Sequence, residues 1–457
     1  MILFFSGYGC ANIIPPEGGP RDSLPPILLK ALPKDSMLLF TGQKIVLTFN
    51  EYIQLDAAKL SNIIVSPYPE KQPSFTGKLE NVTIRLRDTL QPHTTYSINF
   101  GDAIKDVNEG NPYRNFTYVF STDSMLATGT IQGNVQLAET GSIDSTLIAT
   151  LYANLTDTAI QKLKPLYYTR LNGKGAFEFQ FLPDGIYNLF IVPNDYSKKY
   201  DDSTKLFAFA DSPIVVKNGS STPQNLYAFE AVKREDQRQP TAPPVVDNRR
   251  RNIDTVKKIS FTTTLQQKEQ SLLKPFQLTF DKKVTSWDSS KIVLCDTNFH
   301  PLTGYQIVQD STGKIFTFNK AWRPEEYFAL VIDRYAFADS VGTPLRNTDT
   351  LRFKIKSEAA YGSIRLRFKN LDTTRHPVMQ IFGGTELLES VPLSGYEFYR
   401  KLFDPGEYSL RILYDSNKNG IWDPGNYQLK LQPEITEKIN DKINIKSNWD
   451  NEVNINL

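Results

Sequence analysis

A strand–turn–strand pattern occurs twice in this chain and constrains its fold more than any other feature. The better preserved copy lies in residues 402–425 and the weaker copy in residues 181–202. When residues 181–189 are placed on residues 402–410, a Pro/Asp/Gly turn precedes alternating apolar and polar residues in both copies. A turn of this chemistry followed by such alternation is typical of a β-hairpin. We therefore expect a multi-domain β protein that arose by duplication.

The composition agrees with several β domains and excludes some classes of partner. A chain of 457 residues is too long for a single hydrophobic core. Aromatic residues make up 12% of the chain and there are only 4 Met, a composition that favours sheets over helices. The 28 Pro and 25 Gly provide turns for many short strands. A net charge of +2 gives no basic field for nucleic acid. Because no apolar run reaches about 18 residues, we expect no transmembrane helix.

Residues 25–123 contain several short segments in which apolar and polar residues alternate with period two. Ile45, Leu47 and Phe49 share one face of a predicted strand, and Val82, Ile84 and Leu86 share one face of another. Short alternating strands separated by turn clusters predict a β-sandwich.

Two segments of this region resemble the bacterial Ig-like domains of S-layer and other surface proteins. They are residues 45–51, IVLTFNE, and residues 105–112, KDVNEGNP, which corresponds to the loop before the last strand of that family. The resemblance implies an Ig-like fold and no activity.

The next region, which contains the weaker copy of the pattern, resembles a second family. Residues 175–179, GAFEF, and 182–187, LPDGIY, are similar to the signature of carboxypeptidase regulatory-like, or transthyretin-like, sandwiches. That resemblance implies a non-catalytic module of the kind that is fused to surface proteins. Since Phe177, Phe179, Tyr187 and Leu189 alternate along strands, we expect them in the core rather than on a ligand platform.

Both kinds of domain return after a charged, Pro-rich stretch that reads as a linker. Residues 276–281 resemble residues 46–51. Residues 351–357 occupy the position in the second Ig-like plan that residues 116–122 occupy in the first. We therefore predict an all-β fold of tandem β-sandwiches in which Ig-like and transthyretin-like domains alternate in A-B-A-B order. The expected parts are a signal remnant and tether (1–24), Ig-like domains (25–123 and 254–357), carboxypeptidase regulatory-like domains (125–231 and 358–457) and a linker (232–253).

The N-terminus has the form of a membrane anchor. A short apolar run ends at Cys10, as in a lipoprotein signal, and a Pro/Gly-rich spacer follows. Residues 18–26, GGPRDSLPP, also resemble the start of Ig-like lipoproteins of the Bacteroidota. We expect Cys10 to be lipidated and to place the protein on the outer membrane. The alternative is a buried first strand with a free cysteine. The second cysteine, Cys295, lies in an apolar run and is expected to be a small buried core residue.

A polar loop at the end of the better preserved copy is a candidate calcium site. Its oxygen donors recur at every second residue, as in the first half of a calcium-binding loop. The bidentate Glu expected at the twelfth position is Asn426 here, so any site is expected to be weak. The alternative is a polar turn in which Asp and Asn bind their own backbone and Gly420 has positive φ. The candidate ligands are Asp415, Asn417, Asn419, the carbonyl of Ile421, and Asp423.

Two tryptophans in polar loops, Trp422 and Trp449, are candidate platforms for stacking sugars. The alternative is that each ring fills an end of its sandwich or the seam between domains. Only three scattered His are present, which argues against a His-rich metal centre.

No nucleophile elbow, HExxH motif, P-loop or GxGxxG motif occurs, so we expect a protein that is not an enzyme. The preferred hypothesis is a lipid-anchored outer-membrane protein that acts as a scaffold or protein-binding subunit of an envelope complex. Such a complex would serve outer-membrane protein assembly or export. The expected partners are outer-membrane or envelope proteins and the membrane itself, with no nucleic acid. The first alternative is a glycan-binding surface lipoprotein, and the second is a hydrolase whose site is assembled across domains.

Overall fold

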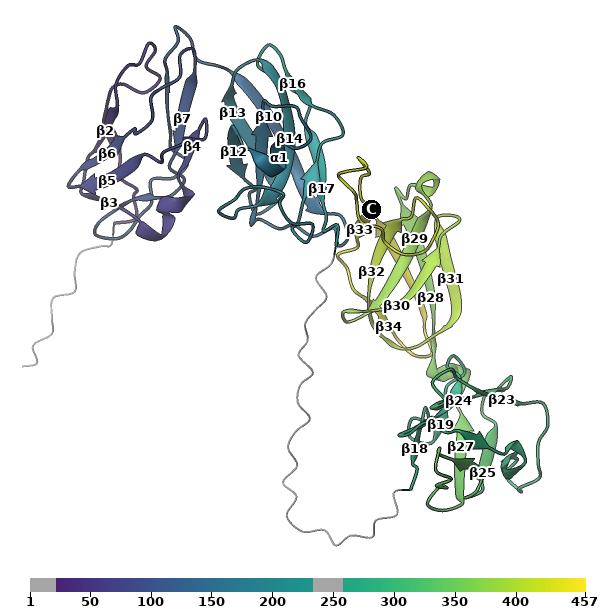
Figure 1. The fold of residues 1–457 in the computed structure, drawn as a ribbon. Helices are drawn as coiled ribbons and strands as arrows, with labels where there is room; N and C mark the ends of the chain where they lie inside the picture. The colour runs from purple at the N-terminus through teal and green to yellow at the C-terminus, as the bar shows by residue number, and fades with distance from the viewer. Residues whose placement is uncertain (1–21, 233–257) are drawn as a thin grey trace, which may run out of the picture. The chain divides into compact units, whose positions relative to one another are not determined.

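The structure, a computed structural model, describes residues 22–232 and 258–457. These residues form strands β1 to β35 and, in the described part of the chain, a single short α-helix, α1 (Ala159–Lys162) (Figure 1). The predicted all-β class is confirmed. Within the same residues, no helix has the length and apolar character needed to cross a membrane. The chain forms two compact units: unit 1 contains Met1–Arg234 and Asp423–Pro433, and unit 2 contains Glu235–Trp422 and Glu434–Leu457.

The N-terminal sandwich of unit 1 consists of short strands with one buried face. Ile45, Leu47, Phe49, Val82 and Ile84 are fully buried, which confirms the predicted period-two faces. Its sheets have the orders β1-β2-β6-β5, β4-β7-β9 and β3-β8. The strands are β1 (Leu28–Leu32), β2 (Lys44–Phe49), β3 (Ile53–Leu55), β4 (Ile64–Ser66), β5 (Ser74–Lys78), β6 (Asn81–Arg85), β7 (Thr95–Asn99), β8 (Ile104–Asp106) and β9 (Thr117–Ser121).

The second sandwich of unit 1 has a parallel pair in one sheet. The long strand β10 pairs antiparallel with β13 and parallel with β17, and the facing sheet has the order β12-β11-β14-β15, with β16 also on β14. Phe177, Phe179, Tyr187 and Leu189 lie in its core, as predicted. The strands are β10 (Gly129–Leu137), β11 (Leu147–Tyr152), β12 (Tyr167–Arg170), β13 (Ala176–Leu182), β14 (Gly185–Pro193), β15 (Ala208–Phe209), β16 (Ile214–Val216) and β17 (Gln224–Ala228).

Unit 1 also includes a distant segment of the chain, Asp423–Pro433. Tyr427 of this segment is buried, with its ring centroid 5.1 Å from those of Phe207 and Phe209 and 5.7 Å from that of Phe190. Its hydroxyl donates to the carbonyl oxygen of Asp157 at 3.1 Å. The boundaries expected from the sequence place this segment in the last domain, residues 358–457, and not with unit 1.

The first sandwich of unit 2 repeats the sheet plan of the N-terminal sandwich, with β19 added. Its sheets have the orders β18-β20-β24-β23, β19-β27-β25-β22 and β21-β26. Cys295, at the end of β22, is buried as predicted. The strands are β18 (Phe261–Thr263), β19 (Glu269–Gln270), β20 (Phe276–Phe280), β21 (Ser286–Trp287), β22 (Ile292–Cys295), β23 (Gln306–Gln309), β24 (Ile315–Asn319), β25 (Tyr327–Ile332), β26 (Phe337–Ala338) and β27 (Asp349–Ile355).

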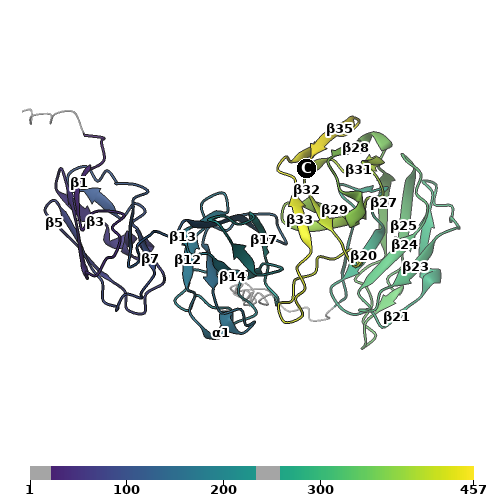
Figure 2. The same cartoon turned by 90° about the horizontal axis from the view of Figure 1, so that it is seen from above.

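The last sandwich of unit 2 repeats the strand order of the second sandwich position by position. The sheet β31-β28-β35, which Figure 2 shows side by side, matches β13-β10-β17 and again contains one parallel pair. The sheet β30-β29-β32-β33, with β34 also on β32, matches β12-β11-β14-β15 with β16. The strands are β28 (Gly362–Lys369), β29 (Pro377–Gly383), β30 (Glu386–Pro392), β31 (Glu397–Phe403), β32 (Gly406–Tyr414), β33 (Ile435–Lys438), β34 (Ile443–Ile445) and β35 (Asp450–Asn456).

Candidate functional site

The candidate calcium loop is organised around the carboxylate of Asp415, which is only 1% exposed. Its oxygens accept hydrogen bonds from the backbone N–H groups of Lys418 at 2.6 Å, Asn419 at 3.2 Å and Gly420 at 2.7 Å. Gly420 has φ 78°, a conformation that favours glycine. This geometry has the features of the polar turn that the sequence analysis gave as the alternative to a calcium site.

Asn417, Asn419 and Ile421 also have partners inside the loop. Asn417 Oδ1 accepts from the Asn419 N–H at 3.0 Å, and Asn419 Oδ1 accepts from the Ile421 N–H at 2.7 Å. Across the described ranges, no group of three or more His, Cys, Asp or Glu is placed to hold a metal ion. Calcium binding by Asp415, Asn417, Asn419, Ile421 and Asp423 stays a prediction.

Glu434, just before β33, contacts this loop, and the sequence pattern did not indicate it. Its carboxylate accepts from the Ser416 N–H at 2.7 Å, and its carbonyl accepts from Trp422 Nε1 at 2.7 Å. Trp422 is therefore half-buried and oriented by a hydrogen bond, as in the alternative in which its ring braces the domain end. Glu434 lies beyond the loop, so no spacing within the Asp/Asn motif pointed to it.

A buried Asp carboxylate that accepts several backbone N–H bonds also occurs in the loop that resembles the Ig-like family. The buried carboxylate of Asp106 accepts from the N–H groups of Glu109 at 2.7 Å, Gly110 at 2.7 Å and Asn111 at 2.9 Å. Burial acts to raise the pKa of Asp106, but these amide hydrogen bonds outweigh it and hold the pKa below its ordinary value. In both loops, an Asp carboxylate thus holds the following Gly-containing turn in place through backbone hydrogen bonds.

Trp449 differs from Trp422 because its side chain is 65% exposed. It lines a cavity of about 340 Å³ together with Tyr399 and Lys401, and Lys446 Nζ lies 5.4 Å from its ring centroid. The structure places Trp449 at this cavity and Trp422 outside its lining. An exposed indole beside an exposed tyrosine is a surface on which a sugar ring can stack.

A larger groove lies within unit 2, between its two sandwiches. This junction groove has a volume of about 830 Å³ and is lined by β30, β31 and the turn before β32 on one side and by residues 273–274 on the other. Leu273 and Leu388 are exposed apolar side chains in its lining, and Phe403 and Tyr408 contribute aromatic surface. The turn of the better preserved sequence pattern therefore forms part of a concave surface.

Charged residues in the junction groove are paired with each other. Arg400 binds Glu389 through two hydrogen bonds of 2.7 Å each. The bonds to Arg400 lower the pKa of Glu389, and the same bonds raise the pKa of Arg400. Lys274 lies 3.5 Å from Asp404. The groove thus combines apolar side chains with two internally paired sets of charges, and Lys356 also lines it.

The edge of a sheet borders this groove. Strand β30 is the terminal strand of the sheet β30-β29-β32-β33 and pairs only with β29. Leu387 and Leu388 on it are about half exposed. No pattern in the sequence indicated this surface, because it depends on two domains and on which strand ends the sheet. The predicted lipidation residue, Cys10, lies outside the described residues.

Comparisons with known proteins support the N-terminal assignment. The family described as "Bacterial Ig-like domain" matches residues 22–122. No curated protein matches the chain.

Three solved structures illustrate the structural similarities. The Bacillus anthracis TIE protein is 11% identical, over 96% of this chain and 75% of that chain, with a TM-score of 0.17. BcpA, the major pilin subunit of Bacillus cereus, is 10% identical over 72% of this chain and 99% of its own, with a TM-score of 0.17. The N-terminal part of the bacterial S-layer protein SbsC is 17% identical over 42% and 43%, with a TM-score of 0.15. Residues 22–122 thus match the bacterial Ig-like domain family, in agreement with the resemblance of residues 45–51 and 105–112.

Proposed function

We propose that this chain is a non-enzymatic envelope protein that is anchored to the outer membrane through a lipid on Cys10 and binds a protein partner. In this role it is a scaffold or subunit of an envelope complex of the Bacteroidota type, one that assembles or exports outer-membrane proteins. The observation that carries the binding role is the junction groove of unit 2, with its exposed leucines beside the free edge of β30.

An extended protein segment is the occupant that fits this groove. A free sheet edge presents unpaired backbone N–H and C=O groups, to which a partner strand can add, and pockets for alternate side chains provide specificity. Leu387 and Leu388 are consecutive, exposed residues of that edge strand, with Glu386 before them and Glu389 after them. An exposed apolar pair on a free strand edge is a surface that a partner strand can cover.

Affinity purification of the tagged chain from membranes tests the partner-binding role. We expect a defined protein to co-purify with the wild type and to be lost with Leu388→Asp, because a charge on the edge opposes both apolar packing and strand addition. Leu79→Asp is the matched control, since Leu79 is also an exposed leucine, in unit 1. Recovery of the wild-type chain alone and monomeric contradicts the proposal.

The lipid anchor is tested separately. Metabolic labelling with palmitate should mark the wild type and not Cys10→Ala, and the variant should be released from the membrane. Membrane retention of the unlabelled variant would refute the anchor.

Glycan capture is the second candidate function, and the exposed Trp449 beside Tyr399 favours it. A glycan array probed with the wild type, Trp449→Ala and Trp422→Ala tests it. Binding that survives both substitutions excludes the tryptophans as the platform.

A further inference from the structure

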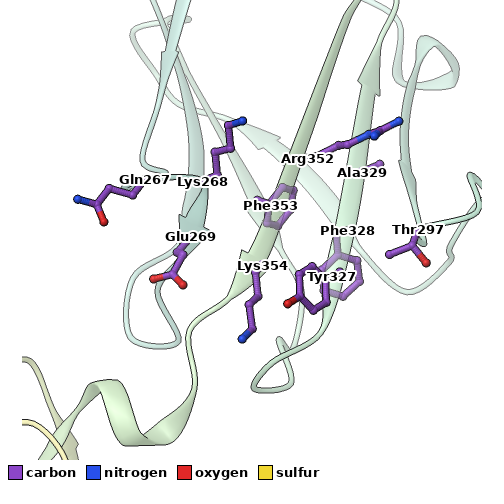
Figure 3. Close-up of a pocket in the computed structure, with 10 residues that line it drawn as sticks. All are labelled: Gln267, Lys268, Glu269, Thr297, Tyr327, Phe328, Ala329, Arg352, Phe353 and Lys354. Carbon is purple, nitrogen blue, oxygen red and sulfur yellow. The ribbon is translucent and has the colours of Figure 1, made fainter.

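A second hollow, separate from the junction groove and from the Trp449 cavity, lies on the first sandwich of unit 2. It has a volume of about 400 Å³ and is formed on the face of the sheet β19-β27-β25-β22 (Figure 3). In the strand register, Tyr327 faces Lys354 and Ala329 faces Arg352. The methyl group of Ala329 leaves space between larger side chains. Thr297, which follows β22, closes one side.

The hollow has three cationic side chains and one acidic one: Lys268, Arg352, Lys354 and Glu269. In the part of the chain that the structure describes, none of the three cations forms an ion pair. Instead, Lys354 Nζ lies 5.5 Å from the ring centroid of Tyr327, and the Arg352 guanidinium lies 5.2 Å from that of Phe299. Aromatic rings attract the charge of a cation without using its N–H donors. The donors remain for an anionic ligand.

The turn that carries Lys268 provides an independent argument. Gln266 and Glu269 exchange two backbone hydrogen bonds of 3.0 and 2.8 Å around Gln267 and Lys268. Both central residues have positive φ, 53° and 66°, as in a type I′ hairpin turn. That turn strongly prefers Asn-Gly, and residues other than Gly, Asn and Asp are strained at positive φ because their Cβ crowds the backbone. Keeping Gln and Lys at these positions costs stability, and both side chains line the hollow.

We propose that this hollow binds the carboxylate-bearing sugar residue of an acidic polysaccharide. The planar fork of Arg352 matches a carboxylate in two hydrogen bonds. The amino groups of Lys354 and Lys268 point in other directions in Figure 3 and add positive charge around the hollow. The exposed ring of Tyr327 provides a face for the sugar ring, and Gln267 and Thr297 provide groups for its hydroxyls. The inference is independent of the proposed protein-binding role.

Other anions fit the same surface less well. An extended acidic peptide gains affinity by adding to a sheet edge, whereas this hollow spans the face of the sheet across β27 and β25. Inorganic phosphate could bind to the cations of the hollow, but it has no ring that could stack on Tyr327.

Calorimetric titration of the full chain with an oligogalacturonate tests the proposal. We expect saturable binding that Arg352→Gln weakens at least about tenfold, the loss typical of a hydrogen bond between charged groups. Arg346→Gln is the matched control, because Arg346 is an exposed arginine of the same sandwich outside the hollow and its loss changes the net charge equally. The carboxyl-reduced oligosaccharide should not bind.

A second variant separates binding from folding. Gln267→Asn combined with Lys268→Gly gives the turn its preferred residues, so we expect a higher Tm together with weaker oligogalacturonate binding. Equal binding by wild type and Arg352→Gln overturns the proposal. So does binding of phosphate or a poly-glutamate peptide with the saccharide inactive, or a double variant that gains stability and keeps full affinity.

Discussion

The hydroxyl of Tyr408 donates a hydrogen bond to the carbonyl oxygen of Asp404 at 2.9 Å, across the turn that precedes β32. Tyr187 makes the corresponding bond to the carbonyl of Pro183 at 3.0 Å before β14. Each ring also lies against the glycine two residues before it, Gly406 or Gly185. The two sequence copies thus fold to the same local contact, which supports their origin by duplication.

Removing this hydroxyl should have a small and measurable effect on stability. We expect Tyr408→Phe to lower the free energy of unfolding of unit 2 by about 1 kcal/mol, the usual net value of one hydrogen bond. Tyr187→Phe should do the same in unit 1. Tyr399→Phe is the control, because Tyr399 is an exposed tyrosine of the same sandwich as Tyr408. Urea unfolding followed separately for the two units measures the effect, and a Tyr408 variant no weaker than the control contradicts it.

Tyr427 should be among the most sensitive positions of unit 1, although it is far from the rest of that unit in sequence. Replacing a buried aromatic ring by Ala typically costs about 3–5 kcal/mol. We therefore expect Tyr427→Ala to accelerate amide hydrogen exchange in β15 and at Phe207, whose ring lies 5.1 Å away. Tyr196→Ala, at a fully exposed tyrosine of unit 1, should leave exchange unchanged. Unaltered protection in Tyr427→Ala would mean that Asp423–Pro433 does not pack there.

The Asp415 loop should owe its order to backbone hydrogen bonds. Asp415→Ala leaves three N–H groups without their acceptor, so we expect a loss of about 2–3 kcal/mol in the stability of unit 2. We expect this loss with calcium present and with a chelator, and no change in the Tm of the wild type on chelation. A rise in Tm with calcium that Asp423→Asn abolishes would instead support the predicted ion site.

Acid should weaken another loop of unit 2. The Thr312 hydroxyl, followed by the Ile315 amide, lowers the pKa of Asp310 from its ordinary 3.8 to about 2. Since the folded pKa is the lower one, the contribution of Asp310 is complete above its ordinary value and is lost as the pH falls toward the folded value. The Tm difference between wild type and Asp310→Asn should therefore shrink between about pH 4 and pH 2. Asp349→Asn is the control, and a difference independent of pH would contradict the assignment.

Local patterns in the sequence predicted the strands well, because burial of one face imposes a period of two. Ile45, Leu47 and Phe49 are buried as expected, and Cys295 is buried in its apolar strand. The Asp-to-Gly loops were visible as turns, since Asp415 and Gly420 lie within a few residues of each other. In each of these cases the interacting residues are close in the chain or alternate along one strand.

Features that join distant residues were not predictable in this way. The parallel pairing of β28 with β35 brings together residues at the two ends of a domain. The packing of Tyr427 on Phe207 depends on the segment Asp423–Pro433, which leaves the sequence of unit 2 and packs in unit 1. The strained turn at Gln267 and Lys268 has no Asn-Gly signal. The junction groove requires two domains, and no single motif encodes it.

The central claim is that the junction groove of unit 2 binds a protein segment. Its most direct test is photo-crosslinking in intact cells, with benzoylphenylalanine in place of Leu388 and, as the control, in place of the exposed Leu79. We predict a discrete crosslink from position 388 to one envelope protein and none from position 79. No crosslink from position 388, or the same products from both positions, would contradict the claim.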